Sequence, residues 1–118
     1  MSQKKRLSSL PKSIITLKIP NEKILYQSYL SFLKHGGLFI KTKRPYQLGK
    51  DVFLLLTLAA ETNPIVGKVV WINPQGAQGG RPPGIGVHFS AMDEGKTRQK
   101  IEQLLVGKLK QEERTYTI

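Results

Sequence analysis

The sequence contains no cysteine. Disulfide bonds, thiol nucleophiles and cysteine-ligated zinc are therefore excluded. It also lacks an apolar run long enough to cross a bilayer, which needs about 20 residues. Its longest apolar stretch, Val52–Ala60, has the length of a strand. The basic residues Lys4, Lys5 and Arg6 are not followed by an apolar segment, as they would be in a secretory signal. We therefore expect a cytoplasmic chain without membrane insertion.

Signatures of catalysis are missing as well. The two histidines, His35 and His88, are not accompanied by a nucleophile motif of the G-x-S-x-G type. Neither the zinc motif H-E-x-x-H nor the phosphate-binding motif G-x-x-x-x-G-K-[ST] occurs. Gly84-Ile85-Gly86 begins like a dinucleotide-binding turn, but Phe89 stands where the third glycine is needed. We expect no enzymatic activity, no metal and no cofactor.

Acidic residues are scarce, with 8 against 19 basic residues and a net charge of +11. Such a balance invites a nucleic-acid-binding interpretation. The basic residues are divided among short clusters, however, and no aromatic residues alternate with them to form a base-stacking platform. We interpret the charge as a lysine-rich surface and expect no direct nucleic-acid binding. The glycine-rich loop Gln75–Arg81 has the composition of an anion cradle, but a flexible connection is the simpler interpretation.

Alternating apolar residues predict a mainly β fold. Hydrophobic residues form 39% of the 118 residues, enough for one domain with a core. Gly86, inside a predicted strand, indicates a bulge, a bend or the close approach of another backbone. We expect a small antiparallel β-barrel of about six strands, punctuated by Gly and Pro and by a turn at Glu61–Pro64. The strand-like runs are Ser13–Ile19, Leu38–Lys41, Val52–Leu58, Ile65–Ile72 and Gly84–Phe89.

Two segments have a different character. Glu22–Lys34 fits a strand period and a helix period equally well, so its structure stays open. Ser90–Leu109 predicts one amphipathic helix, started by Ser90 or Asp93 and carrying an apolar stripe that packs on the core. The stripe consists of Ile101, Leu104, Leu105 and Leu109. We expect residues 1–11 to be a flexible basic leader, 12–110 the domain and 111–118 a tail.

Three sequence segments together resemble the PilZ domain family over most of residues 13–109. They are His35-Gly36-Gly37-Leu38-Phe39-Ile40, Gly67-Lys68-Val69-Val70-Trp71 and Gly84-Ile85-Gly86-Val87-His88-Phe89. The helix that follows them fits the same family. Longer stretches resemble its type IV pilus biogenesis subgroup, namely LYQSYLSFLKHGGLFIKT, GKVVWINPQGAQGGRPPGIGVHF and the terminal TYTI.

The wider family is implied to bind cyclic di-GMP through an R-x-x-x-R segment before the barrel and a D/N-x-S-x-x-G motif. This sequence departs from both motifs. Arg6 is the only arginine before the predicted barrel, and Leu10 stands where its companion belongs. In the second motif Phe32 takes the acidic position and Lys34 the serine position, while Gly37 is retained. Since arginine forks and the Asp/Asn and Ser side chains supply the hydrogen bonds, the ligand site is expected to be missing.

The resemblance then implies a monomeric adaptor required for type IV pilus assembly and twitching motility. Its implied partners are the pilus extension ATPase and a degenerate GGDEF–EAL scaffold, which would hold the dinucleotide. Surplus aromatic residues provide contact area for such partners. An alternative stays open, in which the chain itself is a cyclic di-GMP receptor using Lys4–Arg6 and Lys34. The candidate partner-binding residues are Tyr26, Tyr29, Phe32, Trp71, Pro74, Tyr116 and Ile118.

Overall fold

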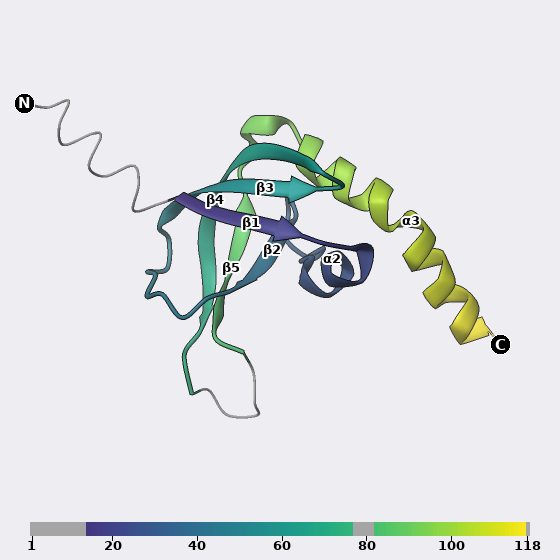
Figure 1. Ribbon diagram of the computed structural model, residues 1–118, viewed down its shortest axis with the longest axis horizontal. Coiled ribbons are helices and arrows are strands. Elements are labelled where there is room, and N and C mark those ends of the chain that lie inside the picture. Colours follow the sequence, from purple (N-terminus) through teal and green to yellow (C-terminus); the bar gives the residue numbers. More distant parts are fainter. Residues whose placement is uncertain (1–13, 77–81, 118) are drawn as a thin grey trace, which may run out of the picture.

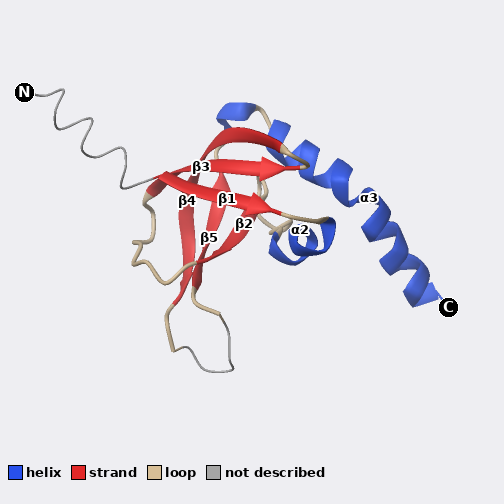
Figure 2. Cartoon of the chain, in the orientation of Figure 1, coloured by secondary structure: helices blue, strands red, loops and turns tan. Residues whose placement is uncertain are grey.

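A computed structural model describes residues 14–76 and 82–117, and it confirms a mainly β fold with a C-terminal helix. Five strands form one strongly curled sheet in the order β1-β3-β4-β5-β2 (Figure 1). Both α-helices lie toward one end of this sheet (Figure 2). The elements are β1 (Ile14–Ile19), α2 (Glu22–Ser28), β2 (Gly37–Lys41), β3 (Asp51–Leu58), β4 (Glu61–Asn73), β5 (Gly84–Phe89), the 3₁₀-helix η3 (Ala91–Asp93) and α3 (Lys96–Thr117).

The observed sheet differs from the expected antiparallel barrel in two respects. It contains five strands within the described residues instead of about six, and β1 pairs with β3 in parallel. The other three strand pairs are antiparallel, as expected. A parallel pair needs a long connection, and here α2 and β2 supply it between β1 and β3. In this part of the chain β1 and β2 are the sheet edges, and α2 packs against both of them.

The predicted strands are confirmed within one residue, except for β4. The run Gly84–Phe89 coincides with β5, and its apolar residues point into the core. The strand β4 begins at Glu61, where the sequence predicted a turn. The turn lies instead at Ala59 and Ala60, which both adopt positive φ angles of 50° and 69°. Pairing with β3 then continues through Glu61–Pro64, so the hairpin is tighter than the proline suggested.

The ambiguous segment after β1 is helical only in its first half. Asn21 caps α2, because its side-chain oxygen accepts a hydrogen bond from the backbone N–H of Ile24 at 2.9 Å. Leu25 is buried in the core, and the helix ends at Ser28. The following residues form turns that lead into β2. Neither one long strand nor one long helix therefore describes Glu22–Lys34.

The predicted C-terminal helix exists, but its boundaries differ. Ser90 caps η3 by accepting a hydrogen bond from the N–H of Met92. Glu94 then adopts a left-handed conformation with φ of 58°, so α3 begins only at Lys96. It continues past Leu109 to Thr117. The predicted core stripe is confirmed at Ile101 and Leu105, which are buried, and Leu104 packs against the core. The side chain of Leu109 lies outside the described ones.

The core lies inside the curl of the sheet and is closed by the two helices. Its members are aliphatic apart from one phenylalanine. They include Leu38, Leu54, Val87, Phe89, Ile101 and Leu105. Helices described between residues 14 and 117 include none that is long and apolar enough to cross a membrane.

Candidate functional site

The loop between α2 and β2 carries the altered ligand motif. Tyr29 forms an isolated bridge with Leu38, and the backbone then turns sharply up to Gly36, whose φ angle is +76°. Only glycine adopts that region easily. Gly37 is needed for a different reason, because a Cβ there would collide with the carbonyl oxygen of Val87 and the side chain of Leu33. Backbone packing therefore explains Gly37 without a ligand.

Arg98, on the first turn of α3, holds this loop by its backbone. Its guanidinium donates hydrogen bonds to the carbonyl oxygens of Leu33 at 2.9 Å, Lys34 at 2.8 Å and Ser31 at 3.3 Å. Its Nε also donates to Glu102 at 3.1 Å. A single arginine thus ties successive turns of the loop to α3.

Glu102 connects the same network to α2. The hydroxyl of Tyr29 donates to Oε2 of Glu102 at 2.7 Å, and Arg98 donates to the same oxygen. Burial, together with the hydrogen bond to Glu102 and its charge, raises the pKa of Tyr29 well above its ordinary value. The tyrosine is therefore a neutral donor at physiological pH.

Three aromatic side chains gather on the outer side of β2, β4 and β5, and we call them the aromatic surface: Phe32, Phe39 and Trp71. Phe32 and Trp71 stack with ring centroids 6.0 Å apart and an interplanar angle of 8°. Phe39 meets Trp71 at 6.1 Å with a tilt of 35°. The indole lies flat on Gly86, where a Cβ would come within 3.1 Å of its Cδ2 atom. Phe32 is the most exposed of the three, at 70%.

A β-bulge in β4 explains why Trp71 points outward. Val69 pairs with Val87 on the core face, but the next pair along the strands is Trp71 with Gly86. Val70 is the extra residue and stays unpaired. Because paired residues share a face, Trp71 follows Gly86 to the outer side of the sheet. Of the features that Gly86 predicted, a bulge is present in the partner strand β4, whereas the atoms that approach Gly86 are those of the indole and not of another backbone.

A pair of histidines adjoins the same loop. The rings of His35 and His88 stack at 5.3 Å with an interplanar angle of 14°. The backbone N–H of His35 donates to Nε2 of His88 at 3.0 Å, so that nitrogen is unprotonated in this arrangement. Burial, followed by the nearby charges of His35 and Lys34, lowers the pKa of His88. The histidine on β5 is therefore a neutral acceptor that supports the loop.

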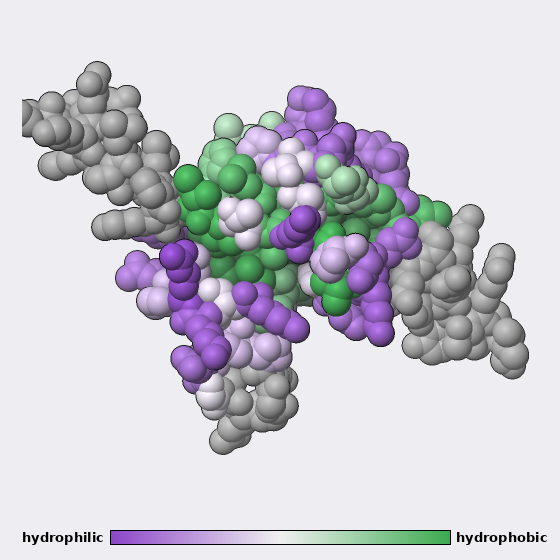
Figure 3. Space-filling model, viewed as in Figure 1, coloured by the Kyte–Doolittle hydropathy of each residue, from purple (hydrophilic) through white to green (hydrophobic). Residues whose placement is uncertain are grey.

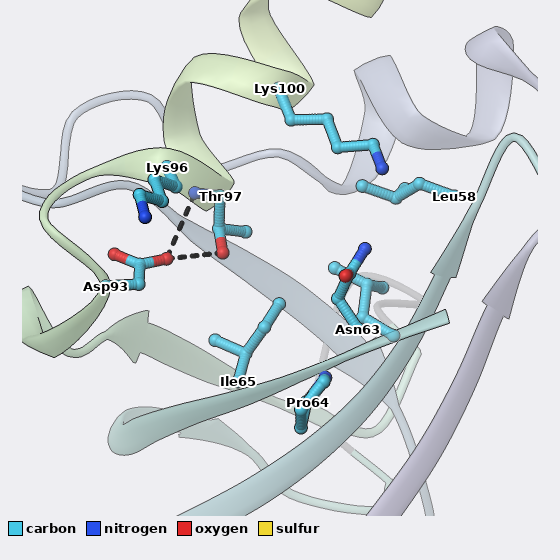
Figure 4. A pocket seen from close by; sticks show the side chains of 9 residues that line it. Leu58, Asn63, Pro64, Ile65, Asp93, Lys96, Thr97 and Lys100 are labelled. Atoms are coloured by element: carbon cyan, nitrogen blue, oxygen red, sulfur yellow. Dashed lines mark hydrogen bonds between the residues drawn. The ribbon is translucent and has the colours of Figure 1, made fainter. Parts of the chain in front are cut away.

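A pocket at the start of α3 is a weaker candidate (Figure 4). Its wall includes Lys96 and Lys100, which suggests an anion site. The backbone N–H and hydroxyl of Thr97 already donate to Asp93, however, and Lys100 is paired with Glu61. Burial alone would raise the pKa of Asp93, but hydrogen bonds from Thr97 and Gly95 outweigh it and lower that pKa. The first turn of α3 is therefore capped from within the chain.

Apolar side chains also gather over β1 and β3 on the face seen in Figure 3. Ile14 and Phe53 are cross-strand neighbours there and are 38% and 39% exposed. Phe53 pairs in turn with Val66 of β4. This one row on the outer side of the sheet is therefore apolar. The next row of paired residues on the same face is polar. In it Lys68 pairs with Asp51 of β3 and with His88 of β5.

The predicted partner-binding residues are only partly brought together. Phe32 and Trp71 are in contact, although they come from different elements. Tyr26 is 38% exposed on α2 and Pro74 is exposed after β4. Tyr29 packs against the core, and its hydroxyl donates a hydrogen bond to Glu102. The backbone of Tyr116 belongs to α3, but its side chain and Ile118 lie outside the described residues. Their roles in partner binding stay predictions.

Two residues of the site were not singled out from the sequence. Phe39 had a usable signal, because it alternates with Leu38 and Ile40 in a strand and faces the glycines of β5. Arg98 had no such signal, since its role depends on carbonyl groups far away in the sequence. The exposed Lys34 lies in the loop before β2, whereas Lys4–Arg6 and Leu10 lie outside the described residues.

The fold and the site together define a small β domain with an exposed aromatic surface. A family model of the PilZ domain matches residues 3–107. The chain therefore belongs to the PilZ domain family, and the resemblance seen in the sequence is confirmed at that level. No curated protein shows significant similarity to it. Membership of this family indicates a regulatory or adaptor role related to cyclic di-GMP, exercised by binding.

Proposed function

We propose that this chain is a cytoplasmic adaptor in type IV pilus assembly that acts through protein contacts and does not itself bind cyclic di-GMP. The implied partners are the pilus extension ATPase and a degenerate GGDEF–EAL scaffold. The observation that carries the proposal is the aromatic surface. One of its members, Phe32, stands at the position where the family motif would place an Asp or Asn side chain.

The chemistry of that position favours a protein partner over a dinucleotide. Phe32 stands at the acidic position of the motif and is 70% exposed. Its ring offers neither a donor nor an acceptor, while it offers a large apolar area at low entropic cost. The backbone carbonyls of Ser31, Leu33 and Lys34 are used by Arg98. These carbonyls are occupied within the chain instead of facing a ligand.

Trp71 adds a second argument. Its indole Nε1 is buried and has no hydrogen-bond partner in the part of the chain that the structure describes. An unsatisfied buried donor costs about 1–3 kcal/mol. Tryptophan is also enriched at interface hot spots, so the side chain at position 71 suits a partner surface.

The proposal is tested by binding measurements on purified proteins. We expect Phe32→Ala and Tyr26→Ala to weaken binding to the extension ATPase about tenfold or more, which corresponds to about 1.4 kcal/mol. Met92→Ala is the matched control, because Met92 is a large exposed apolar residue on η3. Equal affinities for all three variants, with unchanged circular dichroism, would contradict the adaptor proposal.

Calorimetry with cyclic di-GMP addresses the alternative function. We expect no binding heat at about 0.15 M salt, where weak surface attraction is screened. Saturable binding would instead support a receptor that uses Lys34 and Lys4–Arg6. Substituting Lys34→Ala would then weaken it, whereas Met92→Ala would not.

A further inference from the structure

We infer that Arg98 is the positioning residue of the aromatic surface, and that α3 fixes the orientation of Phe32 through it. The inference starts from how the loop around Phe32 is held. This loop has two sides: its backbone carbonyls meet Arg98, and the ring of Phe32 meets Trp71. Both attachments are needed to define one orientation for a side chain as exposed as Phe32.

The carbonyl side of the loop needs a donor of a particular shape. Ser31, Leu33 and Lys34 direct their oxygens toward one guanidinium, and the three N···O distances are between 2.8 and 3.3 Å. Arginine presents five N–H donors in a fixed planar fork, so one side chain can span several acceptors. A lysine ammonium is a point charge on a flexible stem and does not reproduce that geometry.

Arg98 is itself held in place by its surroundings. Its Nε donates to Glu102, one turn further along α3, and Glu102 also accepts from the hydroxyl of Tyr29. In addition, the stem of Arg98 passes close to Gly36, since a Cβ on Gly36 would be in ordinary contact with its Cγ at 3.4 Å. The guanidinium is therefore pre-oriented before any partner arrives.

The remaining contacts of the loop are too few to fix Phe32 alone. Within the loop, the backbone N–H of Gly36 bonds to Leu33 at 2.9 Å and that of Leu33 reaches Leu30 only at 3.4 Å. The N–H of His35 bonds to His88 at the end of the loop. The N–H groups of Leu30 and Phe89 bond to Gly37 and Gly36 and hold the ends of the loop. Apart from the long Leu33–Leu30 bond, Arg98 supplies the hydrogen bonds to the part that contains Phe32. Without it, we expect the loop to sample several positions and the stacking on Trp71 to be lost for much of the time.

Trp71 provides a direct readout, because it is the only tryptophan in the chain. Quenching of its fluorescence by acrylamide measures how well its ring is covered, and a neutral quencher avoids bias from the net charge of +11. Phe32→Ala defines the quenching constant of an uncovered indole. We expect Arg98→Ala and Arg98→Lys to raise the quenching constant from the wild-type value most of the way to the value of Phe32→Ala. Lys100→Ala, which removes another cation from α3, is expected to match wild type.

The double variant separates positioning from general destabilisation. In a Phe32→Ala background, Arg98→Ala should add little further quenching, because no ring remains to be displaced. A folded Arg98→Ala protein with wild-type quenching would overturn the inference, as would wild-type quenching in Arg98→Lys. The inference would also be overturned if Arg98→Ala raised the quenching constant equally in the wild-type and Phe32→Ala backgrounds. If Arg98→Ala does not fold, Arg98→Lys decides the question.

This inference rests on the proposed function only for the use of the surface, and the two fail separately. The quenching experiment contains no partner, so it tests positioning alone. Binding of the extension ATPase tests the use of the surface. If the surface is the partner site, Arg98→Lys should weaken that binding by nearly the same factor as Phe32→Ala. The double variant Arg98→Lys/Phe32→Ala should then bind no more weakly than either single variant.

Discussion

The ring of Phe32 lies within 8° of the plane of the Trp71 indole, with the centroids 6.0 Å apart. One residue comes from a loop and the other from β4 beyond its bulge. Phe32 remains 70% exposed in spite of this contact. The pair is therefore an ordered aromatic feature of the surface and contributes little to the core.

Removing Phe32 should affect binding more than stability. We expect Phe32→Ala to lower the free energy of unfolding by about 1 kcal/mol or less, since an aromatic pair contributes about 0.5–1.5 kcal/mol and this one is largely exposed. Urea denaturation followed by circular dichroism measures the change. Leu105→Ala is the contrasting variant, because its side chain is buried and its truncation should cost about 2–5 kcal/mol. Similar losses for the two would contradict the surface assignment of Phe32.

Gly37 should not tolerate even one added methyl group. A Cβ at this position collides with the carbonyl oxygen of Val87 and with Leu33. We expect Gly37→Ala to reduce the free energy of unfolding by about 1–3 kcal/mol, as overpacking does in other cores. Thermal denaturation is the measurement, and Ser31→Ala, at an exposed position of the same loop, is the control. An unaffected melting temperature would show that β2 and β5 can separate locally without cost.

Acid should weaken the fold through His88. Its pKa in the folded chain is lowered from the ordinary value of 6.5, first by burial and then by His35 and Lys34. As the pH falls through about 6.5, the unfolded chain takes up the proton first, so the free energy of unfolding decreases. Protonation of Nε2 also removes the acceptor for the N–H of His35.

Urea titrations at a series of pH values between about 8 and 5 test this expectation. His88→Gln retains a side-chain oxygen as acceptor but cannot be protonated. We expect the dependence of stability on pH to be shallower in this variant than in the wild type. Identical slopes would assign the acid sensitivity to other groups.

The hydroxyl of Tyr29 should contribute measurably to stability. Tyr29→Phe removes its hydrogen bond to Glu102, which we expect to cost about 1 kcal/mol because the acceptor is charged but partly exposed. In the wild type, the raised pKa of Tyr29 implies that stability is kept below pH 10.0, its ordinary pKa, and lost above it. Chemical denaturation and an alkaline absorbance titration measure the two effects. No difference between wild type and Tyr29→Phe at neutral pH would remove the Tyr29–Glu102 link from the network.

Strands were predictable from the sequence where alternation was regular. The run Gly84–Phe89 alternates apolar residues with Gly and His, and it coincides with β5. The parallel pairing of β1 was not predictable, because strand neighbours depend on distant residues. Glu22–Lys34 stayed ambiguous for a physical reason. A helix of 7 residues followed by turns contains too few helical turns for its hydrophobic period to be recognised in the sequence.

The candidate site was predictable in some of its residues but not in its construction. Phe32 was identified as an aromatic residue of a segment with surplus apolar side chains, and Trp71 because it stands at the end of a strand. Their contact could not be foreseen, since it depends on the bulge at Val70 and on the clamp by Arg98. Hydrogen bonds to backbone carbonyls leave no trace in the residue types of the acceptor segment. The role of Arg98 therefore emerges only from the structure.

The bulge gives β4 two opposite phases of alternation within one strand. Before the bulge, the alternation places Ile65, Gly67 and Val69 on the core face. After the bulge, it places Trp71 on the outer face. If β4 paired regularly through Val70, without the bulge, position 71 would instead face the core with Val69. The aromatic surface would disappear although each of its rings was still encoded. The exposure of the indole is thus set by one additional residue in a strand as much as by the composition of that strand.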